Sequence, residues 1–151
     1  MRKLAIFTLL SLFFLIGALD AAHAQVKDKD KSESRFLPLI SKTTGKTIDT
    51  LSNATTKRQT VKAEGYYNTV SIITTLKKNS GTMAGKLYFQ LSHDGIHFAR
   101  AGGADSLTVT NVDSLSKEFN ISPSRALFYR IEFVGSGTQS TRFNSTAILR
   151  K

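Results

Sequence analysis

The sequence predicts an all-β protein whose fold is an antiparallel β-sandwich, of jelly-roll or Ig-like type, with about eight strands. Three observations lead to this prediction. Apolar and polar residues alternate along several short runs, which is the period of a half-buried strand. Clusters of glycine, asparagine, aspartate and serine separate these runs at short intervals. No stretch of about ten residues carries the period of an amphipathic helix.

Residues 1–24 predict a signal peptide, because they combine the three parts that such a segment needs. Arg2 and Lys3 supply the positive start, residues 4–19 form an apolar run, and Ala22-His23-Ala24 offers a small-residue cleavage site. The alternative is a retained membrane anchor, but the apolar run is shorter than the roughly 20 residues that span a bilayer. We therefore expect export, to the periplasm, the cell surface or the extracellular space, with no retained transmembrane helix.

Residues 25–46 predict a charged, flexible leader that ends in a short apolar segment. Residues 25–35 alternate charges with almost no apolar side chain, so they bury too little surface to offset their ordering entropy. The apolar residues 36–40 either begin the fold as an edge strand, which Pro38 suits, or dock onto a partner; we favour the strand. Residues 47–151 are then the β-sandwich domain.

Six runs in residues 47–151 carry the two-residue period, and each predicts one strand with a buried and an exposed face. In the first run Val70, Ile72, Thr74 and Leu76 share one face. Turn-forming residues at 77–81, 93–95, 101–105 and 135–138 lie between the runs. The runs are residues 67–78, 85–92, 106–112, 117–122, 126–135 and 141–151.

The segment 92–97, SHDGIH, looks like a site but predicts a hairpin turn. Asp94 is suited to accept hydrogen bonds from backbone amides across the turn, and Gly95 supplies a positive φ. An alternating apolar run leads into the segment, and Ile96 and Phe98 lead out of it on the face expected to be buried. We therefore assign Asp94 and Gly95 structural roles.

A metal site or a catalytic triad is the alternative interpretation of the same segment. Either would require His93 and His97 to converge with a third group. His93 lies in the predicted turn, whereas His97 has the outward phase of the following strand. The third histidine, His23, leaves with the signal peptide. The sequence thus predicts no metal site.

The mature chain is strongly basic and has no cysteine. The full sequence carries a formal net charge of +10, and removal of residues 1–24 leaves 19 basic and 10 acidic residues, a net charge of +9. Without cysteine there is no disulfide, no thiolate ligand and no thiol nucleophile. The acidic residues are scattered, and no pair has a spacing that singles out a glycosidase site. We therefore expect no enzymatic activity and no cofactor.

The basic excess and the outward aromatic residues point to surface binding. Basic residues near strand ends favour an anionic surface, an acidic glycan or a negatively charged partner. Nucleic acid is an unfavoured partner because the protein is expected to be exported. If the ligand is a sugar, outward tyrosines would stack on it and polar neighbours would bind its hydroxyls. The candidate ligand-binding residues are Tyr66, Tyr67, Tyr88, Gln90 and Arg130.

The order of several turn motifs resembles small all-β proteins of bacteriophage virions and tails. These motifs are a Ser-Gly-Thr turn before a strand, a Ser-x-Asp-Gly hairpin, a Tyr-Arg strand and a Gly-Ser-Gly-Thr-Gln-Ser-Thr turn. The resemblance covers most of residues 49–151. It implies a structural, self-associating or surface-binding module with no catalytic residues to carry over. The motifs lie in residues 49–54, 80–98 and 128–141 and in the basic C-terminal ILRK.

Two functions follow as hypotheses. The first is a non-enzymatic structural or assembly protein, virion-associated or exported, that forms homo-oligomers or contacts other structural proteins through exposed strand edges and its basic rim. The second is a secreted carbohydrate-binding module built on the outward tyrosines. The absence of tryptophan counts against the second, because flat sugar platforms often use that side chain.

Overall fold

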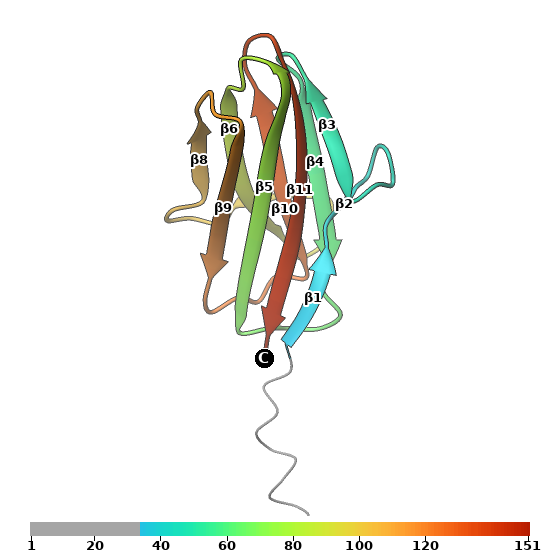
Figure 1. The fold of residues 1–151 in the computed structure, drawn as a ribbon. Coiled ribbons are helices and arrows are strands. Elements are labelled where there is room, and N and C mark those ends of the chain that lie inside the picture. The colour runs from blue at the N-terminus through green and yellow to red at the C-terminus, as the bar shows by residue number, and fades with distance from the viewer. Residues whose placement is uncertain (1–33) are drawn as a thin grey trace, which may run out of the picture. The chain divides into compact units, whose positions relative to one another are not determined.

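The computed structural model describes residues 34–151, which form a two-layer antiparallel β-sandwich (Figure 1). This confirms the predicted fold class. No helix in this part of the chain is long and apolar enough to cross a membrane. The predicted signal peptide and residues 25–33 lie outside the described residues. The strands are β1 (Ser34–Pro38), β2 (Ile40–Ser41), β3 (Ile48–Ser52), β4 (Thr56–Lys62), β5 (Thr69–Gly81), β6 (Gly85–Ser92), β7 (Ala99–Arg100), β8 (Ser106–Val109), β9 (Ser114–Ile121), β10 (Phe128–Gly135) and β11 (Gln139–Arg150).

Eight of these strands pair in the nested order of a jelly roll. β3 pairs with β11, β4 with β10, β5 with β9 and β6 with β8, all antiparallel. The chain thus forms one long folded-back hairpin, which is rolled up so that β11 also pairs with β5 and β10 also pairs with β6. Of the two sandwich types that the sequence allowed, the strand order is that of the jelly roll.

The remaining strands extend the edges of the two sheets. The five-stranded sheet has the order β1-β11-β5-β9, with β3 also on β11; the six-stranded sheet has the order β2-β4-β10-β6-β7, with β8 also on β6. The chain passes from the first sheet to the second between Pro38 and Ile40, at the fully buried Leu39. The apolar segment 36–40 therefore contributes an edge strand, as expected, and the sandwich begins before residue 47.

The core lies between the sheets and includes the faces that the two-residue period predicted, together with Leu51 of β3 and Val61 of β4. Val70, Ile72 and Leu76 of β5 are fully buried, as are the inward residues of β10 and β11, while β6 contributes the fully buried Leu87 and Phe89. Aromatic rings meet across the layers, and the Phe133 and Phe143 ring centroids lie 6.0 Å apart in an edge-to-face arrangement. The alternation of apolar and polar residues thus decides which face of each strand is buried.

One predicted turn is wrong. Residues 77–81 were expected to reverse the chain, but β5 continues through them to Gly81. β11 is long enough to pair with this extension, and a register shift between Ser140 and Thr141 accommodates Asn79 as the extra residue. Backbone pairing with a long neighbour therefore outweighs the local turn preference of these residues, and the reversal falls at residues 82–84.

Candidate functional site

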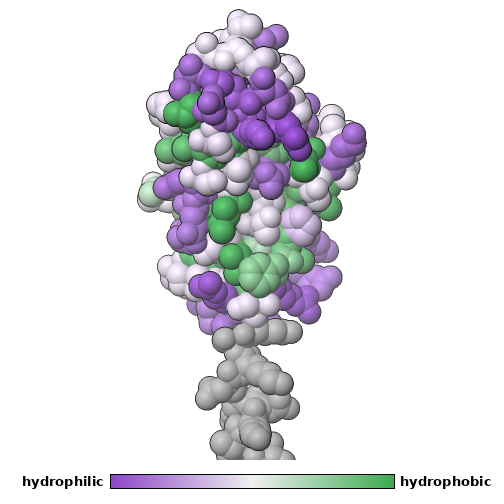
Figure 2. Space-filling view, in the orientation of Figure 1, coloured by the Kyte–Doolittle hydropathy of each residue, from purple (hydrophilic) through white to green (hydrophobic). Residues whose placement is uncertain are grey.

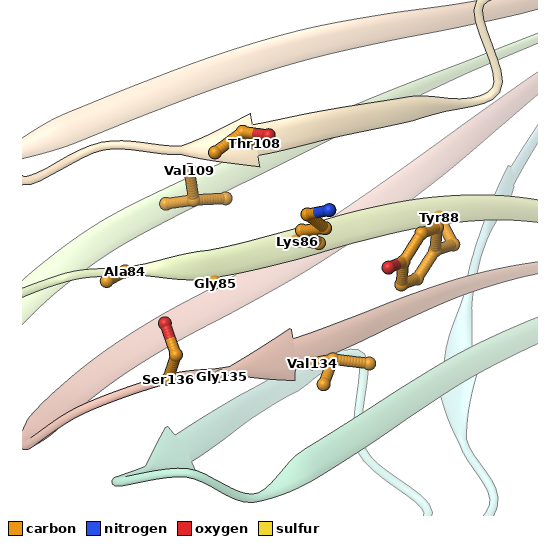
Figure 3. Close-up of a pocket in the computed structure, with 9 residues that line it drawn as sticks. All are labelled: Ala84, Gly85, Lys86, Tyr88, Thr108, Val109, Val134, Gly135 and Ser136. Atoms are coloured by element: carbon orange, nitrogen blue, oxygen red, sulfur yellow. The ribbon is translucent and has the colours of Figure 1, made fainter.

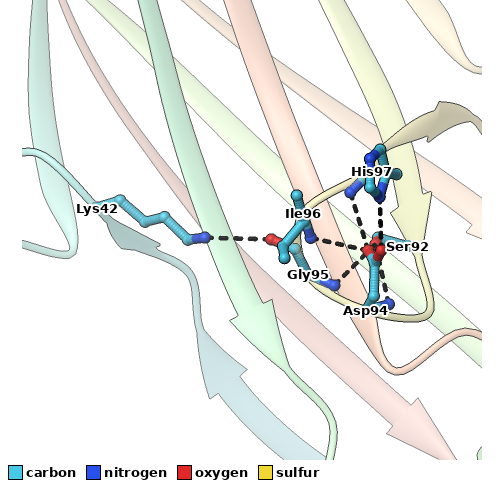
Figure 4. Close-up of polar contacts among 6 residues, drawn as sticks. All are labelled: Lys42, Ser92, Asp94, Gly95, Ile96 and His97. Atoms are coloured by element: carbon cyan, nitrogen blue, oxygen red, sulfur yellow. Dashed lines mark hydrogen bonds and ion pairs between the residues drawn. The ribbon is translucent and has the colours of Figure 1, made fainter.

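The SHDGIH segment forms a turn that is held by the Asp94 carboxylate (Figure 4). Asp94 Oδ1 accepts hydrogen bonds from the backbone amides of Ile96 at 2.8 Å and His97 at 2.9 Å. The Gly95 amide donates to Ser92 Oγ at 2.9 Å, and Gly95 has a φ of 75°. The bond to the His97 ring, followed by these amide bonds, lowers the pKa of Asp94 far below its usual range. These contacts are those of a turn.

The histidines of this segment do not converge on a metal site. His97 Nδ1 lies 2.7 Å from Asp94 Oδ2, and this pair faces solvent. Residues 34–151 contain no group of three side chains placed to hold a metal ion. Ile96 was expected to resume the buried face, but it is 76% exposed, because the turn continues to Phe98 before β7 begins.

The turn folds against the outer face of the six-stranded sheet. A Cβ atom on Gly95 would lie 3.0 Å from the Phe128 ring of β10, so the backbone touches that ring. Phe98, at the end of the turn, stacks under the Arg130 guanidinium, whose central carbon is 3.8 Å from the ring centroid. The turn therefore borders the part of the sheet surface that carries Arg130.

Outward side chains of β6 and β10 form a connected polar surface. Gln90 lies opposite Arg130, and Tyr88 lies opposite Glu132. Arg130 Nε donates to Gln90 Oε1 at 2.6 Å, and Gln90 Nε2 donates to Glu132 Oε2 at 3.3 Å. Arg58 of β4 donates from Nε to Glu132 Oε1 at 2.6 Å. The structure thus brings together Tyr88, Gln90 and Arg130 of the predicted site; with Glu132, we call them the outer-face site.

Arg100 of β7 fixes the Tyr88 ring. Its guanidinium carbon lies 4.3 Å from the ring centroid, in cation–π contact. The same guanidinium donates to the buried Asp105 from Nε at 2.8 Å and from Nη2 at 2.5 Å. These bonds lower the pKa of the Asp105 carboxyl and raise that of Arg100, so both groups stay charged. The Tyr88 ring is therefore oriented before any ligand binds.

A depression of about 430 Å³ opens beside Tyr88 (Figure 3). Small outward residues at the ends of the strands, Ala84 and Ser136, leave this space next to the larger Lys86 and Val134. The surface around the Tyr88 ring is thus hollowed rather than flat. Its lining residues are Ala84, Gly85, Lys86, Tyr88, Thr108, Val109, Val134, Gly135 and Ser136.

A second, polar hollow of about 250 Å³ lies on the β4 side of the same face, and we call it the cationic cleft. Of its residues, only Arg130 was a predicted ligand-binding residue. The outward phase of Arg58 within β4 is a signal that could have identified it, whereas Lys42 reaches the cleft through the loop between β2 and β3. The lining residues are Lys42, Thr43, Thr56, Arg58, Thr60 and Arg130.

The two remaining predicted tyrosines do not belong to the outer-face site. Tyr67 was expected to face outward, but it is 1% exposed and packs in the core, so its ring is not available to a ligand. Tyr66 is 64% exposed and lines a separate cavity of about 530 Å³ formed by the loops at one end of the sandwich. The neighbours of Tyr66 there are Asn68, His93, Ser124 and Arg125.

The outer face of the five-stranded sheet carries hydrophobic side chains. Phe36 of the edge strand β1 is 68% exposed and lies opposite Ile148 of β11. Ile73 of β5 is also exposed and lies diagonally next to Ile148. Figure 2 shows hydrophobic side chains on the lower part of this face and hydrophilic ones at its upper end. We call Phe36, Ile73 and Ile148 the apolar patch.

The known proteins that the chain is similar to share its fold. No family model and no curated protein matches the sequence. A chain in the structure of infectious bursal disease virus, Gx strain, matches with a TM-score of 0.50 and 10% identity over 80% of this chain and 33% of that one. The enzymatically active domain of bacteriophage CBA120 tailspike protein 4 matches with a TM-score of 0.50 and 9% identity over 81% of this chain and 20% of that one.

A family 16 carbohydrate-binding module matches with a TM-score of 0.42 and 13% identity over 63% of this chain and 70% of that one. The structures with this likeness thus include a viral protein, a bacteriophage tailspike domain and a carbohydrate-binding module. This chain spans a third or less of the two viral structures. At these identities the likeness concerns the fold alone.

Proposed function

We propose that the protein is a non-catalytic binding module that holds a glycan chain across the outer face of its six-stranded sheet. The observation that carries this proposal is the outer-face site. Tyr88, Gln90 and Arg130 lie on adjacent paired strands, next to a depression that is open to solvent. An aromatic ring beside amide, guanidinium and carboxylate groups is the combination that binds the apolar faces and the hydroxyls of a sugar.

The dimensions and the rigidity of the surface support this function. β6 and β10 each contain eight residues, so the paired strands offer a face about 25 Å long, which suits an extended ligand. Arg100 holds the Tyr88 ring, and hydrogen bonds hold Gln90 and Arg130. Binding therefore orders few side chains, and the entropic cost of association is small. The expected export of the protein would give it access to extracellular glycans.

The Tyr88→Ala variant tests the proposal, with Tyr66→Ala as the matched control. The wild-type protein is expected to be retarded by at least one polysaccharide in affinity electrophoresis across a panel of soluble glycans. Tyr88→Ala should weaken that binding by about tenfold, because the ring supplies the main apolar contact. Tyr66→Ala should leave it unchanged, since Tyr66 lies at the end of the sandwich. Equal losses in both variants, or no retardation of the wild type by any glycan, would contradict the proposal.

A second candidate function is assembly through the apolar patch. Its supporting observation is that two large exposed apolar side chains, Phe36 and Ile73, lie on the same sheet face around Ile148. Contiguous exposed apolar residues often mark contacts between proteins. A virion-associated or exported homo-oligomer, as the motif resemblance implies, would bury these residues between copies.

Light scattering on the chain from residue 25, at low and at high salt, tests the assembly function. A discrete oligomer that persists at high salt is expected if the apolar patch is the interface, and Phe36→Ser should dissociate it. Ile96→Ser is the control, because Ile96 is equally exposed but lies on the turn after β6. A wild-type monomer at both salt concentrations would rule out this second function.

A further inference from the structure

Basic side chains converge in the cationic cleft from three separate parts of the fold. Arg58 comes from β4, Arg130 from the neighbouring β10, and Lys42 from the loop between β2 and β3. Three threonines complete the lining and add hydroxyl groups that donate hydrogen bonds. The cleft therefore contains three cations and several neutral donors, and no carboxylate is among its lining residues.

The hydrogen bonds of the two arginines leave the ends of both guanidinium groups available. Each donates from Nε, Arg58 to Glu132 and Arg130 to Gln90. Within residues 34–151 their terminal nitrogens have no hydrogen-bond partner, and Arg130 forms no ion pair. The Lys42 ammonium is also available to a ligand, because its one hydrogen bond, to the Gly95 carbonyl, is long at 3.3 Å (Figure 4). Among the described residues, the cleft thus has one ion pair, between Arg58 and Glu132.

Burial makes the positive charge of Arg130 costly, and Glu132 offsets only part of this cost. Arg130 is half-buried, and burial lowers its pKa; the nearby positive charge of Arg58 acts in the same direction, while Glu132 opposes both. A negatively charged group in the cleft would offset the cost of burying the Arg130 charge and would receive hydrogen bonds from two planar guanidinium forks.

We propose that the cationic cleft binds an acidic substituent of the glycan, a carboxylate or a sulfate ester, and so makes the module selective for acidic polysaccharides. This inference rests on the proposed function, because Arg130 belongs both to the cleft and to the outer-face site. The two surfaces are therefore continuous, and a chain that contacts Tyr88 reaches the cleft along the same sheet. The net charge of +9 that residues 25–151 carry also attracts such polymers to the protein.

Two pairs of polymers test the charge preference with the backbone held constant. Polygalacturonate is compared with its highly methyl-esterified form, and dextran sulfate is compared with dextran. The charged member of at least one pair should bind at least about tenfold more tightly than the neutral member, which corresponds to about 1.4 kcal/mol. The first pair reports a carboxylate substituent and the second reports a sulfate ester.

The double variant Lys42→Gln/Arg58→Gln tests the location of the preference. It should reduce binding of the charged polymer to the level of the neutral one. Lys77→Gln/Arg142→Gln is the matched control, because it removes the same charge from paired residues on the other sheet and should leave the preference intact. Lys42→Gln alone should give a partial loss, and it avoids any effect of removing Arg58 from Glu132. Thermal unfolding of each variant verifies that it is folded.

The outcomes separate this inference from the proposed function. If glycans bind and Tyr88→Ala weakens them, but charged and neutral forms bind equally, the acidic preference is refuted and the binding module stands. Equal losses in both double variants would refute the cationic cleft as the site of the preference. They would show that the net charge of the protein alone attracts the charged polymer. If no glycan binds, the proposed function fails. If vesicles of anionic phospholipid or single-stranded DNA bind while the acidic glycans do not, the ligand is a phosphate-bearing membrane or nucleic acid and the inference is overturned.

Discussion

At the scale of single residues, Asp94 connects the turn after β6 to the candidate site. Its carboxylate holds the backbone of the turn, and the turn carries Phe98 to its place under Arg130. Asp94 would not contact a ligand in the proposed site, but it therefore affects the orientation of Arg130, which would.

Asp94→Ala should lower the thermal unfolding midpoint, and the effect should depend on pH. Because the folded state lowers the pKa of Asp94, the carboxylate stabilises the protein above about pH 4, and this stabilisation is lost as the pH falls through the lowered value. Unfolding scans between pH 2 and pH 7 measure it, with Glu118→Ala as a control for the loss of an exposed carboxylate. A constant difference between wild type and Asp94→Ala across this range would contradict the prediction.

Gly85→Ala should destabilise the fold far more than Gly137→Ala, although both glycines have a positive φ. A Cβ on Gly85 would lie 2.2 Å from the Val134 carbonyl oxygen, so β6 and β10 would have to separate at the depression. No atom lies within 4 Å of the same position on Gly137. We expect about 3 kcal/mol for Gly85 and about 1 kcal/mol for Gly137, measured by urea unfolding. Similar losses in the two variants would show that backbone strain alone matters at Gly85.

At the scale of elements, the passage of the chain from one sheet to the other ties β1 and β2 into the core. Leu39→Ala should cost about 2–5 kcal/mol, because Leu39 is fully buried between the sheets. Ile40→Ala should cost less than about 1 kcal/mol, since the Ile40 side chain is 45% exposed. Chemical unfolding compares the two. Equal effects would mean that the segment 36–40 is not an integral part of the sandwich.

The sequence predicted the strands that carry a clear two-residue period, but it predicted neither β3 and β4 nor the neighbours of each strand. The two-residue period identified the buried faces of β5, β6, β10 and β11, because the side chains of a strand alternate by geometry. It failed at Tyr67 and Ile96, which lie in connections where the backbone leaves the strand geometry. The two-residue period could not predict which strands pair, because alternation specifies the buried face of a strand and does not specify its partners.

The difference between regular strands and their connections also explains which site residues were predicted. Tyr88, Gln90 and Arg130 were correctly placed outward, and their proximity follows from the pairing of β6 with β10. Lys42 was missed because it reaches the cationic cleft from a loop, and loop positions depend on the completed fold. Sequence patterns thus identified the side chains on regular strands and did not identify those that a distant segment contributes.

At the scale of the whole molecule, the jelly-roll pairing joins segments from opposite ends of the chain. β3 pairs with β11 and β4 with β10, so much of the sandwich depends on contacts between distant residues. Refolding should therefore take about milliseconds to seconds. Because the chain has no tryptophan and four tyrosines, stopped-flow circular dichroism or tyrosine fluorescence should follow it. Complete refolding within microseconds would contradict this expectation.

The pairing of β1 with β11 also determines how the sandwich responds to mechanical force. Ser34, where β1 begins, lies directly opposite Arg150, where β11 ends. A pulling force applied between these two positions acts across the strand pair rather than along it, so the inter-strand hydrogen bonds are loaded one after another. The protein should therefore peel open from this edge at low tension, whereas a load between distant ends of the same strands would shear many bonds at once.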